Sequence, residues 1–329
     1  MKLILDSYGT ALLRKDHHLI VRNKEGTFDI DPEKVETILV SRGVVVSSDA
    51  LILAIENSID VIFTDKRGSV KGRVWSAKIG SATIIRRRQL EFTFSPKAVE
   101  WIKKIIMEKI SNQIALLLAY YPDEKPLQTE FDTVINRLED YRKKVETVKG
   151  DVIPQVAHTL RGWEGSASRN YFSLLGKILP EQYQSSGRSQ HPARDLFNAL
   201  LNYAYGILYG KIEAALVRAG IDPYVGVLHR EEYNRPVLTY DVIEKYRIWA
   251  DYVVVSLLQQ EVFGDEAYSV DSQGAYWLEG LGKRILIQAM YDYLAEEVQF
   301  DKKKMSREKH IEKFASDLAT MFFRFKISK

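Results

Sequence analysis

The chain has 329 residues, of which 46% are apolar and 28% are charged, and its formal net charge at pH 7 is +3. This length predicts two domains with a substantial core, and the small net charge means that any nucleic-acid binding must rest on local basic clusters. The absence of cysteine excludes disulfides, thiolate zinc sites and a cysteine nucleophile.

The N-terminus and the longest apolar runs give no sign of a membrane location. The run after Met1 is too short for a signal peptide, and no stretch reaches the ~18 apolar residues of a membrane span. We therefore expect a cytoplasmic protein with no membrane partner.

The pattern of residues 1–85 predicts a small β-domain that contains one helix. Turn residues at Gly9, 24–26 and 65–68 separate short β-branched runs, and a helix capped by Ser48 is expected over 48–57. The expected strands are 2–5, 18–22, 37–40, 44–46 and 61–63. Because sheet edges can pair between chains, this domain is a candidate for dimerisation.

A change of period near residue 86 predicts a linker and then a larger all-α domain. The linker covers 86–95 and contains an arginine triplet from Arg86, which suits either a solvated segment or a track for phosphates. After Ser95 and Pro96, apolar residues recur every three or four positions, a pattern typical of helices with one buried face. The chain is thus expected to be an α+β protein whose helical domain covers 96–329, with further helices at 126–149, 281–294 and 307–325.

Glu164 is an acid in a context of aromatic and small residues. Gly165 follows it directly, and Tyr171 lies about two helical turns further on. A carboxylate among apolar groups is costly to bury unless a cation or hydrogen bonds offset that cost. Metal ligation and a salt bridge to Arg161 or Arg169 are both open explanations.

The segment 226–247 contains a second group of possible ligands. His229 closes an apolar run, and Asp241 and Glu244 follow three residues apart in a helical pattern. Carboxylates at this spacing share a helix face, and with a histidine and another acid they can hold a divalent cation. Alternatively, Asp241 is a helix N-cap and Glu244 its partner in an acidic capping box.

A mostly apolar helix is expected after Asp195. Asn198 and Asn202 lie four residues apart in it and therefore on one face. They can donate to a phosphate or pair with each other inside the core.

Together these motifs form an ordered set. It comprises Trp163-Glu164-Gly165 with Tyr171-Phe172, Gly187-Arg188 with Asp195, 198–203, Gly226 to His229, and Arg235-Pro236 with Asp241, Glu244 and Arg247. The set resembles the CRISPR-associated integrase that inserts new spacers, the Cas-one family, and the resemblance covers nearly the whole chain. Where the family often has proline after the acid at 195 and the arginine at 247, this chain has Leu196 and Ile248.

The resemblance implies a metal site in the helical domain, and this domain would then be the catalytic domain. Glu164, His229 and Glu244 match the family's metal ligands, and Asp241 matches an assisting acid. Mg²⁺ or Mn²⁺ is the expected cofactor, since carboxylates suit both ions and an imidazole leans slightly to Mn²⁺. The residues expected to position DNA phosphates are Arg188, Asn198, Tyr203 and Arg235.

The function implied by the resemblance is that of a metal-dependent DNA endonuclease and integrase in adaptive antiviral defence. Such an enzyme inserts short fragments into a CRISPR array by attack of a 3′-hydroxyl on a phosphodiester, and water in place of the hydroxyl gives hydrolysis. The implied partners are double-stranded DNA, as fragment and as repeat, a second copy of the chain, and the small companion Cas-two protein. The alternatives are a metal-free DNA-binding scaffold of the same assembly and a hydrolase of a phosphorylated small molecule, against which the lack of a GxxxxGK[ST] motif counts.

Overall fold

The computed structural model describes residues 2–35, 37–57, 59–64, 70–74, 82–190, 192–229, 235–300 and 303–326. The chain divides into two compact units, Met1–Gly80 and Ser81–Lys329. Strands dominate the first unit and helices the second, which confirms the α+β prediction. The expected turn at 65–68 lies outside the described residues, as do residues 230–234 of the segment 226–247.

The first unit contains two four-stranded sheets and one helix around a shared core. Their elements are β1 (Lys2–Leu5), β2 (Ala11–Lys15), β3 (His18–Asn23), β4 (Gly26–Ile30), β5 (Thr37–Val40), β6 (Val45–Val46), α1 (Ser48–Glu56), β7 (Asp60–Thr64) and β8 (Val70–Arg73), with a short 3-10 helix at Pro32–Lys34. The strand orders are β4-β3-β2-β6 and β1-β5-β7-β8. Leu12, Ile38 and Val61 are fully buried between these sheets and α1. The sequence pattern predicts five of the strands and α1, but not β2, β4 or β8.

The second unit begins with a helix where a linker is expected. Helix α2 covers Ala82–Thr93, so the prediction of a linker over 86–95 is wrong for most of its length. Ile85, Gln89 and Phe92 form its buried face, and the Nη1 atom of Arg88 donates a hydrogen bond to the carbonyl oxygen of Phe325. The arginine triplet therefore belongs to a packed helix.

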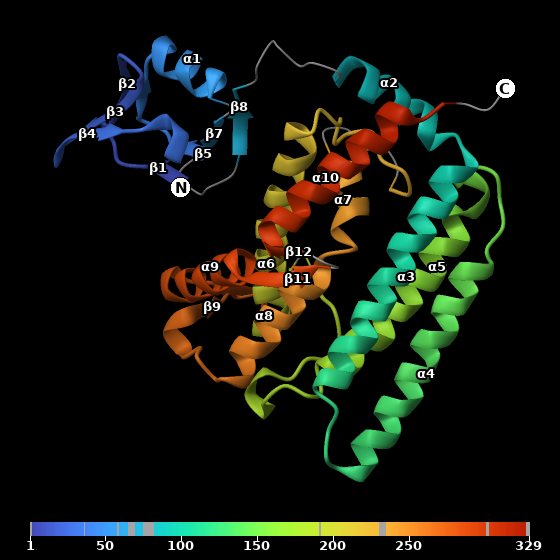
Figure 1. Cartoon of the computed structure of the whole chain (residues 1–329). Coiled ribbons are helices and arrows are strands. Elements are labelled where there is room, and N and C mark those ends of the chain that lie inside the picture. Colours follow the sequence, from blue (N-terminus) through green and yellow to red (C-terminus); the bar gives the residue numbers. More distant parts are fainter. Residues whose placement is uncertain are drawn as a thin grey trace. The chain divides into compact units, whose positions relative to one another are not determined.

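Two groups of helices build the rest of the unit and share one core. Three long helices pack side by side (Figure 1): α3 (Pro96–Ala119), α4 (Lys125–Thr147) and α5 (Ile153–Leu175). The second group surrounds α6 (Leu196–Arg218) and comprises α7 (Val237–Ile243), α8 (Arg247–Gln259), α9 (Gly280–Ala295) and α10 (Arg307–Arg324). Helix α3 also contacts α7 and α8, which joins the two groups.

Short elements complete the second unit. Two antiparallel hairpins pair β9 (Tyr268–Val270) with β10 (Tyr276–Leu278) and β11 (Glu297–Phe300) with β12 (Lys303–Ser306). Short 3-10 helices lie at Glu181–Tyr183 and Asp265–Ala267. Across the described ranges, none of the helices combines the length and apolar composition that a membrane crossing requires.

Candidate active site

A cavity of about 700 Å³ in the second unit collects side chains from elements that are far apart in the sequence. Helix α3 contributes Lys109, α5 contributes Glu164, and α6 contributes Tyr205. His229 comes from the segment that precedes α7 in the sequence, and Glu244 directly follows that helix. The three candidate metal ligands, Glu164, His229 and Glu244, therefore line one cavity.

Lys109 places its ammonium group between two of these candidate ligands. Its Nζ donates a hydrogen bond to Oε1 of Glu164 and lies 2.5 Å from Oε2 of Glu244. Burial lowers the pKa of Lys109, but the charges of Glu244 and Glu164 outweigh burial and raise it. The ammonium is therefore protonated at neutral pH, and the ion-pair partner of Glu164 is a lysine from another helix.

Glu244 is held by two cations. The Nε atom of Arg247 donates to its Oε1 at 2.9 Å. Its Oε2 is buried and faces the ammonium of Lys109 without an aligned hydrogen bond from the described residues. Burial raises the pKa of Glu244, but Arg247 and Lys109 outweigh burial and hold the pKa at about 2. Glu244 is thus ionised at neutral pH, and each of its two oxygens contacts a cation, Oε1 that of Arg247 and Oε2 that of Lys109.

Asp241 fixes the loop that carries His229. Its fully buried carboxylate accepts hydrogen bonds from the backbone N–H groups of Val227, Leu228 and His229 at 2.5, 3.1 and 3.0 Å. Burial lowers the pKa of His229, but the Asp241 carboxylate, 2.7 Å from Nδ1, raises it by more. Because Asp241 engages Nδ1, the other ring nitrogen, Nε2, remains as a potential ligand atom.

These contacts contradict the capping interpretation of Asp241 and Glu244. Helix α7 begins after Pro236, so Asp241 lies inside the helix and Glu244 at its C-terminal end. Neither carboxylate is therefore at the helix N-terminus, where a capping box would place them.

Gly226 permits the close turn that precedes His229. A Cβ atom at this position would come within 2.9 Å of the carbonyl oxygen of His229 and of a methyl carbon of Val237. Only glycine allows the backbone to approach this closely without displacing either group. The Gly226 to His229 motif is thus a steric requirement of the loop.

Two asparagines of α6 hold Arg188 at the cavity. Its Nη1 atom donates to Oδ1 of Asn198 at 2.8 Å, and its Nη2 atom donates to Oδ1 of Asn202 at 2.5 Å. Asn198 is fully buried, and its amide nitrogen donates to the carboxylate of Asp195 and to the carbonyl oxygen of Gly187. The described contacts of the two asparagines do not include a bond between them, because both side chains position Arg188; donation to a phosphate stays a prediction. Arg188 is then the member of this group that can face a phosphate.

Tyr203 and Arg235 are not among the described residues that line the cavity. Tyr203 is half-buried, and burial, followed by nearby Tyr291, raises its pKa. Arg235 is exposed immediately before Pro236. The tyrosine that does line the cavity is Tyr205, two residues further along α6.

Buried Asp251 on α8 supports the cavity from behind. Its Oδ2 and Oδ1 accept hydrogen bonds from the hydroxyls of Tyr171 and Tyr205 at 2.9 and 2.5 Å. The guanidinium carbon of Arg247 lies 4.6 Å from the centroid of the Tyr205 ring. Burial raises the pKa of Asp251 to about 6, although its bonds to Tyr205 and Tyr171 favour the ionised form. This network fixes Tyr205 and, through it, Arg247.

Sequence reasoning does not assign Lys109 to the site, although the sequence contains a signal for it. Lys109 follows the buried residues Ile102 and Ile106 of α3 at helical spacing. A lysine on an otherwise apolar helix face indicates a buried anionic partner. Asp251, between the buried residues Ala250 and Val253, carries the same signal.

The chemical types of the candidate ligands fit a hard divalent cation. Their positions in this structure, however, are not those of a metal-binding site. Two carboxylates and an imidazole suit Mg²⁺ or Mn²⁺, and the buried Oε2 of Glu244 has a cation, the Lys109 ammonium, as its contact among the described residues. However, among the described residues no three acidic or histidine side chains are grouped closely enough to hold a metal ion. The position between Glu164 and Glu244 is taken by the ammonium of Lys109.

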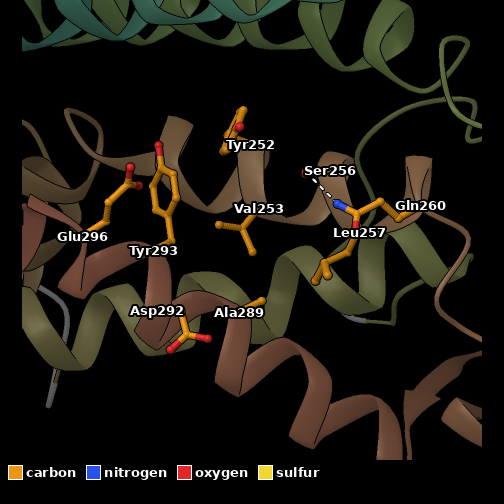
Figure 2. A pocket seen from close by; sticks show the side chains of 9 residues that line it. All are labelled: Tyr252, Val253, Ser256, Leu257, Gln260, Ala289, Asp292, Tyr293 and Glu296. Atoms are coloured by element: carbon orange, nitrogen blue, oxygen red, sulfur yellow. Dashed lines mark hydrogen bonds between the residues drawn. The ribbon is translucent and has the colours of Figure 1, made fainter. Parts of the chain in front are cut away.

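A separate cavity of about 340 Å³ lies between α8 and α9 (Figure 2). Its wall includes Tyr252 and Tyr293, whose ring centroids are 5.3 Å apart, together with Asp292 and Glu296. It shares no lining residue with the larger cavity and contains none of the candidate ligands.

The acids, histidine and arginines of the larger cavity define a site suited to phosphate chemistry. Residues 3–292 match the model of the family described as "CRISPR associated protein Cas1". The chain therefore belongs to the Cas1 family, the family that the motifs indicate.

Individual relatives and solved structures match this chain over most of its length. The "CRISPR-associated endonuclease Cas1 1" of Archaeoglobus fulgidus is 29% identical over 315 residues, which are 91% of this chain and 90% of the relative. A chain of the solved "Cas6-RT-Cas1--Cas2 complex" has a similar fold, with a TM-score of 0.74 and 23% identity over 98% of this chain and 35% of that longer chain. A "Casposase bound to integration product" has a TM-score of 0.68 and 20% identity over 99% of this chain and 96% of that one.

Proposed function

We propose that this protein is a metal-dependent DNA endonuclease and integrase that inserts short DNA fragments into a CRISPR array. The observation that carries the proposal is that Glu164, His229 and Glu244 line one arginine-containing cavity in a member of the Cas1 family. Two similarities support it: the Archaeoglobus fulgidus relative is named an endonuclease, and the casposase of similar fold is bound to an integration product.

In the proposed mechanism, Glu164, His229 and Glu244 hold Mg²⁺ or Mn²⁺. The bound ion would activate a 3′-hydroxyl, or water, as the nucleophile and stabilise the charge that develops on the phosphodiester oxygens. Asp241 holds Nδ1 of His229 and thereby leaves Nε2 as the ligand atom.

Arginines of the cavity position the DNA in this proposal. Arg247 keeps Glu244 ionised. Arg188, fixed by two asparagines, is directed to bind a phosphate next to the reacting bond. Arg235 and Tyr203 stand outside the described cavity wall, so we assign them no contact with the reacting phosphate.

The proposed assembly contains a homodimer and the small companion protein Cas2. In the first unit, a groove of about 330 Å³ is lined by residues that include Ile4 and Phe28, which are 60% and 46% exposed. We assign this groove, with its exposed apolar side chains, to contact with a second copy. The fold shared with the chain in the Cas6-RT-Cas1--Cas2 complex supports Cas2 as the further partner.

The proposal is tested by incubating purified protein with a 3′-hydroxyl DNA duplex, a plasmid that carries a CRISPR repeat, and Mn²⁺. Strand joining is measured on a denaturing gel. Glu164→Gln and Glu244→Gln should each lower the rate by more than the about 10- to 100-fold that loss of an outer-shell partner costs, and chelation of the metal should abolish joining. Glu146→Gln, which changes an exposed acid on α4, is the matched control and should leave the rate unchanged.

The metal-free scaffold is the second candidate, because Lys109 already neutralises both carboxylates. It predicts DNA binding that is indifferent to Mn²⁺ and no strand joining under any condition. Full joining activity in both glutamine variants would instead show that the reaction takes place elsewhere.

A further inference from the structure

The contact between Lys109 and two candidate metal ligands has a consequence for metal loading. Lys109 is 7% exposed, and its ammonium contacts Glu164 on one side and Glu244 on the other. A divalent cation bound by these carboxylates needs the same oxygen atoms, including Oε2 of Glu244. Two cations cannot share this position, since their mutual repulsion is strong in a buried site.

We propose that Lys109 acts as an internal competitor of the metal ion: its ammonium occupies the cation position between Glu164 and Glu244, and the ion binds only when Lys109 leaves it. Lys109 thereby sets the metal concentration at which the site loads. This inference rests on the proposed metal-dependent function and adds to it a residue that controls metal affinity.

The metal-free protein needs such a cation. Glu164 and Glu244 approach one another closely enough to share the Lys109 ammonium, and two carboxylates in one buried site repel unless a positive charge lies between them. Arg247 binds only the other oxygen of Glu244. Lys109 therefore balances the negative charge of both acids and holds them in place while no metal is bound.

The cavity provides space for the Lys109 side chain to move away from the two carboxylates. Its side chain ends in a flexible four-carbon stem, and it lines a cavity of about 700 Å³ that contains hydroxyl groups such as that of Ser168. The ammonium can therefore withdraw from the carboxylates into a polar space without unfolding α3. A lysine held in a tight pocket would not have this freedom.

The chain provides a matched control on the same helix. Lys103 lies on α3, is also 7% exposed, and pairs with Glu100 at 2.9 Å and with the carbonyl oxygen of Val148 at 3.0 Å. It does not line the cavity. Lys103→Met thus removes a buried, ion-paired lysine without removing the competitor.

The first experiment is calorimetric titration of the DNA-free protein with MnCl₂. Lys109→Met should bind Mn²⁺ more tightly than the wild type, by about 5- to 150-fold, the usual range of coupling between two ligands. Lys103→Met should bind as the wild type does, and Lys109→Arg, which keeps the positive charge, should not gain affinity. Should Lys109→Met fold only when Mn²⁺ is present, that rescue also supports the proposal.

A second experiment uses the wild-type chain alone. Reductive methylation of lysines is followed by mass spectrometry with and without Mn²⁺. Lys109 should react faster when Mn²⁺ is present, because its ammonium is displaced, while the reactivity of Lys103 should not change. Unchanged or slower reaction of Lys109 would overturn the proposal.

The outcomes separate this inference from the proposed function. Equal Mn²⁺ affinity of the wild type and Lys109→Met overturns the competition and leaves the metal site intact. Failure of both proteins to bind Mn²⁺ at any concentration, with both folded, overturns the metal site itself.

Discussion

Nδ1 of His229 lies 2.7 Å from Oδ1 of Asp241, and this contact connects an irregular loop to a fully buried carboxylate. The same carboxylate accepts three backbone hydrogen bonds from the loop. Asp241 thus fixes the position of the loop and the orientation of the His229 imidazole.

Replacement of Asp241 should weaken both the fold and the site. Asp241→Asn offers one acceptor oxygen and a new donor to a loop that presents only N–H groups, so at least one buried donor loses its partner. We expect the free energy of unfolding to fall by about 1–3 kcal/mol, measured by urea denaturation. Strand joining should fall as well, and the NMR signals of the His229 ring should shift. Asp292→Asn, in the separate cavity, is the control.

Asn198→Ala should loosen the segment that carries Arg188. The buried amide of Asn198 bonds to Arg188, Asp195 and Gly187, and all these bonds are lost in the variant. Hydrogen exchange of the backbone at 185–190 should accelerate, and DNA affinity should fall because Arg188 is no longer fixed. Tyr203→Phe should change neither quantity. Unaltered exchange in Asn198→Ala would contradict this account of the loop.

The stability of the protein should depend on the protonation of Asp251. Its pKa is about 6 in the folded protein, above the ordinary value of 3.8. The protonated form therefore contributes stability below pH 3.8, and this contribution is lost as the pH rises through 6, by about 3 kcal/mol in total. The Asp251→Asn variant should not lose this stability as the pH rises, because its side chain does not titrate.

The measurement is the free energy of unfolding of both proteins between pH 4 and pH 7. The free energy of unfolding of Asp251→Asn, minus that of the wild type, should increase steadily as the pH rises. Comparison of the two proteins removes the opposite contribution of Glu244, whose lowered pKa makes stability fall as the pH decreases from 4.5 toward 2. A difference that is independent of pH would show that Asp251 does not titrate in this range.

The aromatic contact between α2 and α10 should be a major source of stability. Phe322 is 1% exposed, and its ring centroid lies 5.3 Å from that of Phe92. Phe322→Ala should cost about 3–5 kcal/mol because it leaves a cavity in the core. The neighbouring Phe323 is 46% exposed, and Phe323→Ala should change stability by less than about 0.5 kcal/mol. Denaturant unfolding of the two variants makes the comparison directly.

The elements with a regular burial pattern were predictable from the sequence, and those without it were not. Helices α3 and α10 place apolar residues at helical spacing; the start of α3 at Pro96 was expected, and so was α10, over 307–325. Strand β4 is mostly exposed and therefore lacks the alternation that predicts a strand. In α2, three successive arginines interrupt the apolar pattern of a short buried face. The sequence of this segment therefore indicates a linker instead of a helix.

The candidate site was predictable to the extent that its residues carry a family motif. Glu164, His229 and Glu244 do so, and the structure brings all three to one cavity. The position of Lys109 depends on how α3 packs against α5 and α7, and sequence spacing within one helix does not contain that information. The partners of Asn198 depend likewise on a loop that folds back over α6.

The contact between α2 and α10 joins the first and last helices of the second unit (Figure 1). Because the two ends of this unit are held together by Arg88 and by the Phe92–Phe322 contact, its topology is nearly closed. A circular permutant of the second unit alone should therefore be obtainable, with a short peptide joining the end of α10 to the start of α2 and new termini in the turn between α3 and α4. In such a permutant the polypeptide would pass through the helices in a different order and yet assemble the same cavity.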